Sequence, residues 1–467
     1  METEPQKLTN KNKTLMMAVL LAGAFTALLA ETFLNNALPT IMDAFQVKQS
    51  TAQWLTTAYL LIVGLMIPLS AWIFESFNLK TNYIAMIVIF LCGSLLCVFA
   101  PNFTFLLTGR IIEAVAAGGL MPFIQNVILL LFPPEKRGLA MGITGLVIGF
   151  GPAVGPTISG LILKYSDWQM LFIVLSLCSA VIGILAVFTV QNITVPQQAT
   201  TDLVSFVESI LGFGLLLYAL SEVGNTGRFN LRLTVMFFLG LLVIALFCLR
   251  QLHLETPLLD IRVFKNLQFD LCTLLSMISN IAMVSIELVL PLYLQTTRNE
   301  SALTSGLIMM PGALVMVLCN PLSGALFDKL GIKKLSFFGY FVLLLGTLPM
   351  LSFNAKTSLV LIASCYTLRM VGIAFTMMTT FTAGINLIDP KLTAHANAAS
   401  STLRQIGGSL GTALAMLVVT IAAGQYKTSP GLGLTQGFHW SFILMLLFAL
   451  VGFIASFFLP SARKSAA

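Results

Sequence analysis

Two acidic residues lie inside apolar stretches that are long enough to cross a lipid bilayer. Glu31 lies within residues 15–39, and Glu287 lies within residues 271–294. An ionised carboxylate near the bilayer centre costs at least ~2.5–3.5 kcal/mol on insertion scales, so it persists only where it faces a polar cavity, forms a pair or takes up a proton. A carboxyl group that exchanges a proton between the two sides of a membrane can drive transport.

We therefore expect Glu31 and Glu287 to be proton or cation sites. Asn35 follows Glu31 by four residues and would share its helix face. The alternative for Glu31 is a structural carboxyl group that is hydrogen-bonded to a neighbouring helix. The alternative for Glu287 is a solvated group near the outer mouth of the protein.

The composition indicates an α-helical membrane protein with many spans. The chain has 467 residues, of which 57% are hydrophobic and 9% are charged, whereas a soluble domain carries about 25% charged residues. The net charge of +7 lies in short loops and tails, so it does not indicate nucleic-acid binding. No phosphate-binding loop or C-x-x-C pair is present. We expect no enzyme activity, no catalytic residue, no metal site and no cofactor.

Fourteen apolar stretches approach or exceed the ~20 residues that a membrane-spanning helix needs. They are residues 15–38, 52–74, 82–100, 103–130, 138–163, 169–190, 204–223, 232–250, 270–294, 303–327, 335–353, 358–384, 396–423 and 439–460. With the N-terminus inside, 15 lysines and arginines face the cytoplasm and 7 face outward. Since cytoplasmic loops carry the excess of basic residues, we expect both termini to be cytoplasmic.

Internal similarity indicates two related halves. The sequence AWIFESFNLKT (71–81) is similar to GALFDKLGIKK (324–334), and Arg110 has a counterpart in Arg369. Parallel repeats of this kind are typical of secondary transporters, with the substrate site near the midplane between the halves. The predicted division is a tail at 1–14, a six-helix half at 15–190, two extra helices at 191–250, a loop at 251–269, a second six-helix half at 270–460 and a tail at 461–467.

Several stretches together carry a family resemblance. They are ETFLNNALPTIM (31–42), QWLTTAYLL (53–61), GITGLVIGFGPAVGPTISG (142–160), GALFDKLGIKK (324–334) and LRQIGGSLGTAL (403–414). In these the chain resembles the fourteen-spanner drug:proton antiporters of the major facilitator superfamily. The resemblance implies an all-α major facilitator fold with two extra central helices. It also implies a monomer in the bacterial cytoplasmic membrane that exports small amphipathic, cationic compounds, driven by the proton gradient.

Two motifs would form the gates of such a carrier. In the fifth span, small residues let a neighbouring helix approach and prolines permit bending; these residues are Gly145, Gly149, Gly151, Pro152, Gly155 and Pro156. We expect only hydrogen to fit at Gly149 and Gly155. The loop motif of the second half contributes Asp328, Lys329, Gly331 and Lys333. Because the first half has Glu75 in place of the family's aspartate, we expect the second copy to fasten the inward-side gate more firmly.

Arg110 and Glu113 lie three residues apart and would share one helix face. The resemblance implies that Arg110 tunes proton transfer, and the alternative is a static ion pair that holds two helices together. Arg404 begins its span near the cytoplasm and could extend its side chain to the membrane surface.

Two other functions remain open at this point. One is the export or flipping of a dedicated endogenous molecule, such as a lipid, a peptide or a siderophore. The other is a membrane receptor or scaffold, which is disfavoured because no soluble effector domain is present.

Overall fold

The computed structural model describes residues 10–196, 202–425 and 430–460, and all regular secondary structure in these ranges is helical. The α-helices are α1 (Asn10–Phe45), α2 (Gln49–Ala52), α3 (Trp54–Ser76), α4 (Leu79–Val98), α5 (Phe103–Leu131), α6 (Arg137–Tyr165), α7 (Gln169–Thr189), α8 (Leu203–Thr226), α9 (Leu231–His253), α10 (Leu267–Thr296), α11 (Ala302–Leu330), α12 (Ile332–Thr347), α13 (Leu359–Ile385), α14 (Thr393–Gln425) and α15 (Pro430–Ser456). The short 3₁₀ helices are η1 (Pro134–Lys136), η2 (Ile261–Lys265), η3 (Leu348–Ser352) and η4 (Pro390–Leu392).

Each predicted span lies on one of the long helices, so the all-helical membrane architecture is confirmed. Thirteen helices in the described part of the chain are long and apolar enough to cross a membrane, and α6 adds a further helix of 29 residues. Helices suit this setting because lipid offers no partner to backbone N–H and C=O groups. The predicted span 335–353 agrees with the candidate span Ile332–Ser352, within which α12 ends at Thr347 and η3 follows. Pro349 has no N–H to continue the α-helical pattern.

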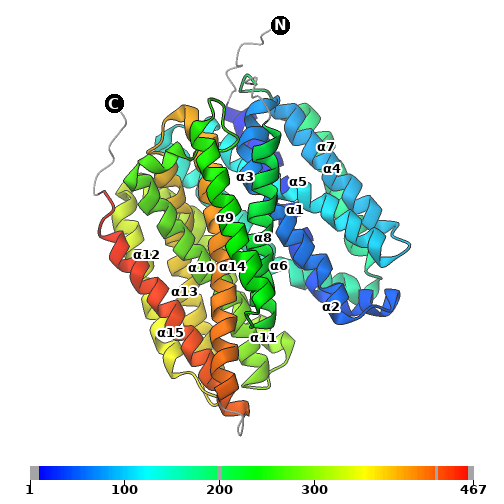
Figure 1. Ribbon diagram of the computed structural model, residues 1–467, viewed down its shortest axis with the longest axis vertical. Helices are drawn as coiled ribbons and strands as arrows, with labels where there is room; N and C mark the ends of the chain where they lie inside the picture. Colours follow the sequence, from blue (N-terminus) through cyan, green and yellow to red (C-terminus); the bar gives the residue numbers. More distant parts are fainter. Residues whose placement is uncertain (1–9, 197–201, 426–429, 461–467) are drawn as a thin grey trace.

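The long helices pack as two groups (Figure 1). α1 and α3 to α7 pack on one another, and α10 to α15 form a second group, while α8 and α9 pack mainly on each other and on α14 and α3. The two large groups meet where α6 packs against α11 and where α3 packs against α14. Among the described residues these are the two larger contacts between the groups, and smaller ones join α6 to α13 and α5 to α14. Each of the two larger contacts pairs the second long helix of one group with the fifth long helix of the other.

α1 begins and α15 ends at the same end of the bundle, the upper end in Figure 1. We call this end the terminal face and the opposite end the far face. The terminal face also carries the ends of α3 and α11 and the beginnings of α6 and α14, because successive long helices alternate in direction. The two larger contacts between the groups, α6 with α11 and α3 with α14, can therefore be followed from the terminal face inward.

The approach of α6 to α11 is closest at the terminal face and opens toward the far face. A Cβ atom added to Gly138 would lie 2.5 Å from the Gly324 carbonyl oxygen, and one added to Gly142 would lie 2.6 Å from the Asn320 carbonyl oxygen. At Gly145 the nearest atom of α11, in Asn320, would be 3.1 Å away, and at Gly149 the nearest would be 3.7 Å away. The two helices therefore diverge with distance from the terminal face.

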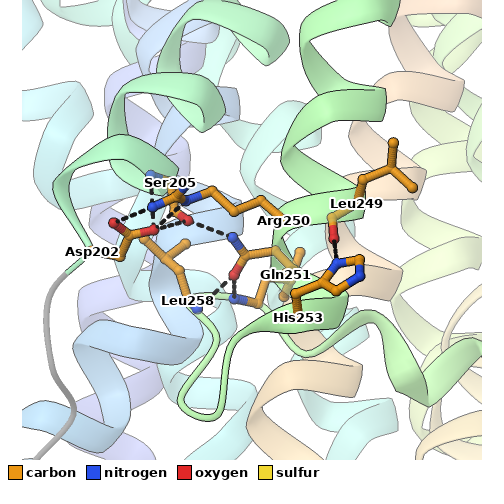
Figure 2. Close-up of polar contacts among 8 residues, drawn as sticks. Asp202, Ser205, Leu249, Arg250, Gln251, His253 and Leu258 are labelled. Carbon is orange, nitrogen blue, oxygen red and sulfur yellow. Dashed lines mark hydrogen bonds and ion pairs between the residues drawn. The ribbon is translucent and has the colours of Figure 1, made fainter.

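A polar cluster joins α8 and α9 at the terminal face (Figure 2). The Asp202 carboxylate accepts a hydrogen bond from Arg250 Nε at 2.6 Å and caps α8 by accepting from the Ser205 amide. Gln251 donates to Ser205 Oγ at 2.6 Å and accepts from the Leu258 amide at 2.7 Å. The hydrogen bond from Arg250 holds the pKa of Asp202 well below its usual range. This cluster fixes the helix pair to the loop that leads into α10.

Candidate functional site

A cavity of about 180 Å³ lies between the two groups of helices, and we call it the central cavity. Its walls come from α1, α3, α5 and α6 on one side and from α10, α13 and α14 on the other. Most of the lining is apolar, and the polar or charged side chains are Glu31, Tyr59, Gln125, Asn280, Ser401, Arg404 and Gln405. An apolar cavity with a few polar groups is typical of a small-molecule site.

Glu31 lines the central cavity, and its role as a proton or cation site stays a prediction. Its half-buried side chain forms no hydrogen bond or ion pair with the part of the chain that the structure describes. Glu287 on α10 is also half-buried and unpaired within the described ranges. The two carboxylates come from different groups of helices, Glu31 from α1 and Glu287 from α10. Within the described residues, neither carboxylate accepts a structural hydrogen bond, which was the alternative for Glu31.

Arg110 and Glu113 form a fully buried ion pair, with 2.6 Å between Nη1 and Oε2. Ser94 on α4 donates to the other carboxylate oxygen of Glu113 at 2.5 Å. The guanidinium of Arg110 lies 4.0 Å from the ring centre of Tyr59, which in turn donates to the Ala27 carbonyl oxygen of α1 at 3.0 Å. The pair therefore connects four helices around one side of the central cavity, and a role in proton transfer stays a prediction.

The fifth-span glycines face two different neighbours. Gly145 and Gly149 face Asn320 and Met316 of α11, whereas Gly151 and Gly155 face Leu28 and Thr32 of α1. At Gly149 an added Cβ would make ordinary van der Waals contact, so the expectation that only hydrogen fits there is wrong for this conformation. At Gly155 an added Cβ would collide with Thr32, so that part of the expectation agrees with the geometry.

Three predicted residues, Asn35, Pro152 and Pro156, have side chains that lie outside the described residues.

The second loop motif fastens α11 to α6 at the terminal face. Asp328 accepts hydrogen bonds from the backbone amides of Gly138 and Leu139, each at 3.0 Å, and Asn320 donates to the Gly145 carbonyl oxygen at 2.8 Å. Lys329 and Lys333 form no ion pair with another described residue. Gly331 has φ of 79°, a conformation that favours glycine, and it separates α11 from α12. Of these four residues, Asp328 makes the contact between groups.

Three residues of α14 that sequence reasoning did not select also contact the central cavity or the first group. His395 Nε2 lies 3.3 Å from a Glu75 carboxylate oxygen, and Asn397 donates to Asn126 Oδ1 at 2.7 Å. Arg404 lies about 16 Å along the helix from Thr393, at a rise of 1.5 Å per residue, and faces the central cavity. The proposal that Arg404 extends to the membrane surface is therefore wrong. The polarity of these side chains within an apolar span was the signal that could have identified them.

Within the described residues no group of three or more histidine, cysteine, aspartate or glutamate side chains could hold a metal ion.

Comparisons with known proteins identify the family. The profile of the Major Facilitator Superfamily matches residues 20–412. The chain is 35% identical to the lincomycin resistance protein LmrB of Listeria monocytogenes, over 96% of this chain and 97% of that protein. It is 29% identical to the riboflavin transporter RibZ of Clostridioides difficile, over 86% of this chain and 87% of that protein.

A solved structure shares the fold. The crystal structure of the human organic anion transporter MFSD10 matches 94% of this chain and 99% of that chain, with a TM-score of 0.66 and 13% sequence identity. At this identity the likeness shows the fold alone.

Proposed function

Because the chain belongs to the Major Facilitator Superfamily and is a multi-pass membrane transporter, we propose that it exports amphipathic, cationic compounds in exchange for protons. The observation that carries this proposal is the pair of half-buried carboxylates, Glu31 and Glu287, which are unpaired among the described residues and come one from each group of helices. A carboxylate without a protein partner is available to a proton or to the cationic group of a substrate. The relative named for lincomycin resistance supports a drug as the substrate.

The exchange follows from competition at these carboxylates. A substrate cation binds where a carboxylate is ionised, and a proton that arrives from outside neutralises the same group and weakens the binding. The substrate then leaves, and the protonated carrier returns and releases its proton to the cytoplasm. Asn35 would lie beside Glu31 on its helix, and the Arg110–Glu113 pair would set the electrostatic field in which Glu31 titrates.

The terminal face would be the cytoplasmic side, in the bacterial cytoplasmic membrane. The excess of basic residues on this side supports that orientation. The described conformation, with α6 and α11 closest at the terminal face, would then be closed toward the cytoplasm. In the return step the same contacts would open, and Gly145 to Pro156 would be the part of α6 that adapts.

The orientation is tested with single cysteines in a cysteine-free background. Lys391 is exposed at the terminal face and Lys356 is exposed at the far face. In intact cells a membrane-impermeant maleimide should label Lys356→Cys and leave Lys391→Cys unlabelled until the cells are opened. The reverse pattern would overturn the orientation, and labelling of both positions in sealed cells would overturn the even number of spans.

The function is tested by ethidium efflux from loaded cells, with and without a protonophore. Wild-type cells should export ethidium, and the protonophore should stop the export. Glu31→Gln should abolish efflux at normal expression, because an amide cannot be ionised, and Glu31→Asp should retain part of it. The matched control is Glu222→Gln, which removes a carboxylate near the far end of α8 and outside the central cavity. Normal efflux by a well-folded Glu31→Gln protein would contradict the proposal.

A second candidate is a carrier dedicated to one endogenous molecule, such as a lipid, a peptide or a siderophore. The likeness to a protein named as a riboflavin transporter favours it. Under this candidate, ethidium efflux would be absent, and the medium of cells that overproduce the carrier would be enriched in one metabolite. Energy-dependent efflux of several unrelated dyes would exclude it.

A further inference from the structure

Three arginines lie within the spans, and their surroundings differ. Arg110 is fully buried and paired with Glu113 at 2.6 Å. Arg369 is also fully buried, and it donates to Thr347 Oγ1 and to the Ala282 carbonyl oxygen. Arg404 is the one of the three that lines the central cavity. Its surroundings therefore bear on what the cavity can bind.

Arg404 has no carboxylate partner among the residues that the structure describes. Its Nη2 donates to Ser401 Oγ at 3.0 Å, and its guanidinium lies 4.5 Å from the ring centre of Phe381. Its Nε is buried and has no hydrogen-bond partner within the described ranges. A guanidinium carries five N–H donors and no acceptor, so one protein hydroxyl leaves most of its donor capacity unused.

An unpaired cation inside a membrane protein is costly, so it indicates a function or an absent partner. Glu31 is the carboxylate that lines the same cavity, and it contributes from α1 on the other side. No carboxylate oxygen of the described residues comes within 4.0 Å of Arg404, so Glu31 does not neutralise it by contact. The cavity thus presents one acidic and one basic group that are not in contact, in a lining that also includes the apolar Val63, Met121 and Met377.

The planar fork of a guanidinium matches the geometry of a carboxylate or a phosphate, to which it can donate two parallel hydrogen bonds. A ligand that satisfied both groups would place an ammonium near Glu31 and an oxyanion near Arg404, with an apolar body between them. We infer that the central cavity selects zwitterionic amphipaths, and that Arg404 is the residue that binds their oxyanion. This inference rests on the proposed function for the transport of such molecules, but the binding step can be tested alone.

A pair of dyes isolates the effect of the oxyanion on binding, because the two differ in that negative charge and are otherwise closely similar. Rhodamine 19 carries a free carboxylate on a cationic xanthene, and rhodamine 6G is its ethyl ester, which lacks that negative charge. Binding of each dye to the full-length protein in lipid nanodiscs is measured by fluorescence polarisation at neutral pH, after subtraction of empty nanodiscs. No proton gradient is present in this assay, so the result does not depend on transport.

Arg404→Gln should weaken the binding of rhodamine 19 by about 10-fold or more, as expected for the loss of a charge-assisted, bidentate contact. It should leave the binding of rhodamine 6G within about twofold, which also shows that the variant is folded. Arg404→Lys keeps the charge but loses the fork and should fall between Arg404→Gln and the wild type for rhodamine 19. The control is Lys334→Gln, which removes one positive charge from an exposed site at the terminal face.

Three results would overturn the inference: no binding of rhodamine 19 by the wild type, equal weakening of both dyes by Arg404→Gln and Arg404→Lys, or no effect of either variant. Equal weakening would assign Arg404 to the structure of α14 instead of the ligand. A selective loss of rhodamine 19 binding combined with efflux that ignores a protonophore would support the inference and contradict the proposed proton coupling. The failures of the two proposals are therefore distinguishable.

Discussion

The two copies of the loop motif fasten the terminal face in different ways. At the end of α11, Asp328 accepts from two backbone amides at the start of α6, each at 3.0 Å. At the end of α3, the corresponding Glu75 lies 3.3 Å from the ring nitrogen of His395 near the start of α14. Both carboxylates therefore meet the N-terminal end of a helix in the other group, but one contacts the backbone and the other contacts a side chain.

This difference shows how two copies of one motif can hold the same face closed with unequal strength. An anion at a helix N-terminus is stabilised by the amides and by the helix dipole, and it needs no particular side chain opposite it. The Glu75 contact depends on His395, whose Nδ1 accepts the Asp260 amide hydrogen at 3.1 Å and leaves Nε2 to donate. The geometry thus supports the expectation that the second copy fastens this face more firmly.

The largest effect should come from a change that makes the second copy resemble the first. Ala71 in the first copy aligns with Gly324 in the second, and Gly324 is in close contact with Gly138. In Gly324→Ala the new Cβ would collide with the backbone of Gly138, at a cost of about 1–3 kcal/mol to the closed terminal face.

The measurements are the initial rate of efflux and the labelling, in inverted vesicles, of a cysteine at Ser401. Efflux should fall several-fold, and labelling should accelerate because the cavity opens to the terminal face more often. The control Ala71→Gly should leave both rates near those of the wild type. Slower labelling of Gly324→Ala would show that this contact does not hold the face closed.

The second effect concerns the carboxylates themselves. Asp328→Asn keeps the size of the side chain but loses the charge that meets two amides, and hydrogen bonds to charged groups contribute about 1.5–3 kcal/mol. Efflux should fall clearly, and by more than in Glu75→Gln. Asp389→Asn, which changes a capping carboxylate on the same face, is the control. If Glu75→Gln had the larger effect, the comparison between the two copies would be reversed.

A third, smaller effect is expected at His395 and distinguishes the Glu75–His395 contact from the contact of Asp328 with backbone amides. His395→Gln removes the ring that meets both Glu75 and the Asp260 amide. If Glu75 acts through His395, the double variant Glu75→Gln/His395→Gln should be no slower in efflux than the worse single variant. Additive losses would show that the two residues act independently. The same cycle between Asp328→Asn and His395→Gln should be additive, because those contacts lie on different helix pairs.

The sequence sufficed for the fold and for part of the site. Length and hydropathy predict the spans because the backbone groups of a segment in lipid can form hydrogen bonds only within their own helix. Charged residues such as Glu31 and Arg110 are easily recognised within an apolar span. It was harder to predict which neighbouring helix a given residue contacts. Gly155 packs against α1 and not against the other group of helices, and nothing in the glycine spacing indicates which neighbour a helix face meets.

Two further residues show what sequence reasoning could not supply. His395 is isolated in the chain, and it gains a role only because folding brings Glu75 and Asp260 beside it. From the sequence, Arg404 could extend to the membrane surface, whereas in the structure it lines the central cavity. In both cases the partners come from segments that are distant in sequence, so local sequence patterns cannot predict these contacts.

The smallest effect should come from an acid on the terminal face that does not join the two large groups. Asp202 pairs with Arg250 and caps α8, and Arg250 holds the pKa of Asp202 well below its usual range (Figure 2). Asp202→Asn keeps a good capping residue and loses a partly exposed ion pair, so the cost should be about 0–1 kcal/mol. Asp202→Ala also loses the cap and should cost about 1 kcal/mol more.

Since the folded pKa of Asp202 is depressed, its contribution to stability is present above the ordinary aspartate pKa of ~3.9 and declines as the pH falls below that value. Thermal unfolding at pH 7, followed by intrinsic fluorescence, should therefore rank wild type, Asp202→Asn and Asp202→Ala in order of falling stability. Efflux should stay near the wild-type rate in Asp202→Asn, because α8 and α9 do not form the contact that opens and closes. A loss of transport as large as that of Asp328→Asn would show that the helix pair takes part in the gate, and the contrast between the two loop copies would then describe only part of it.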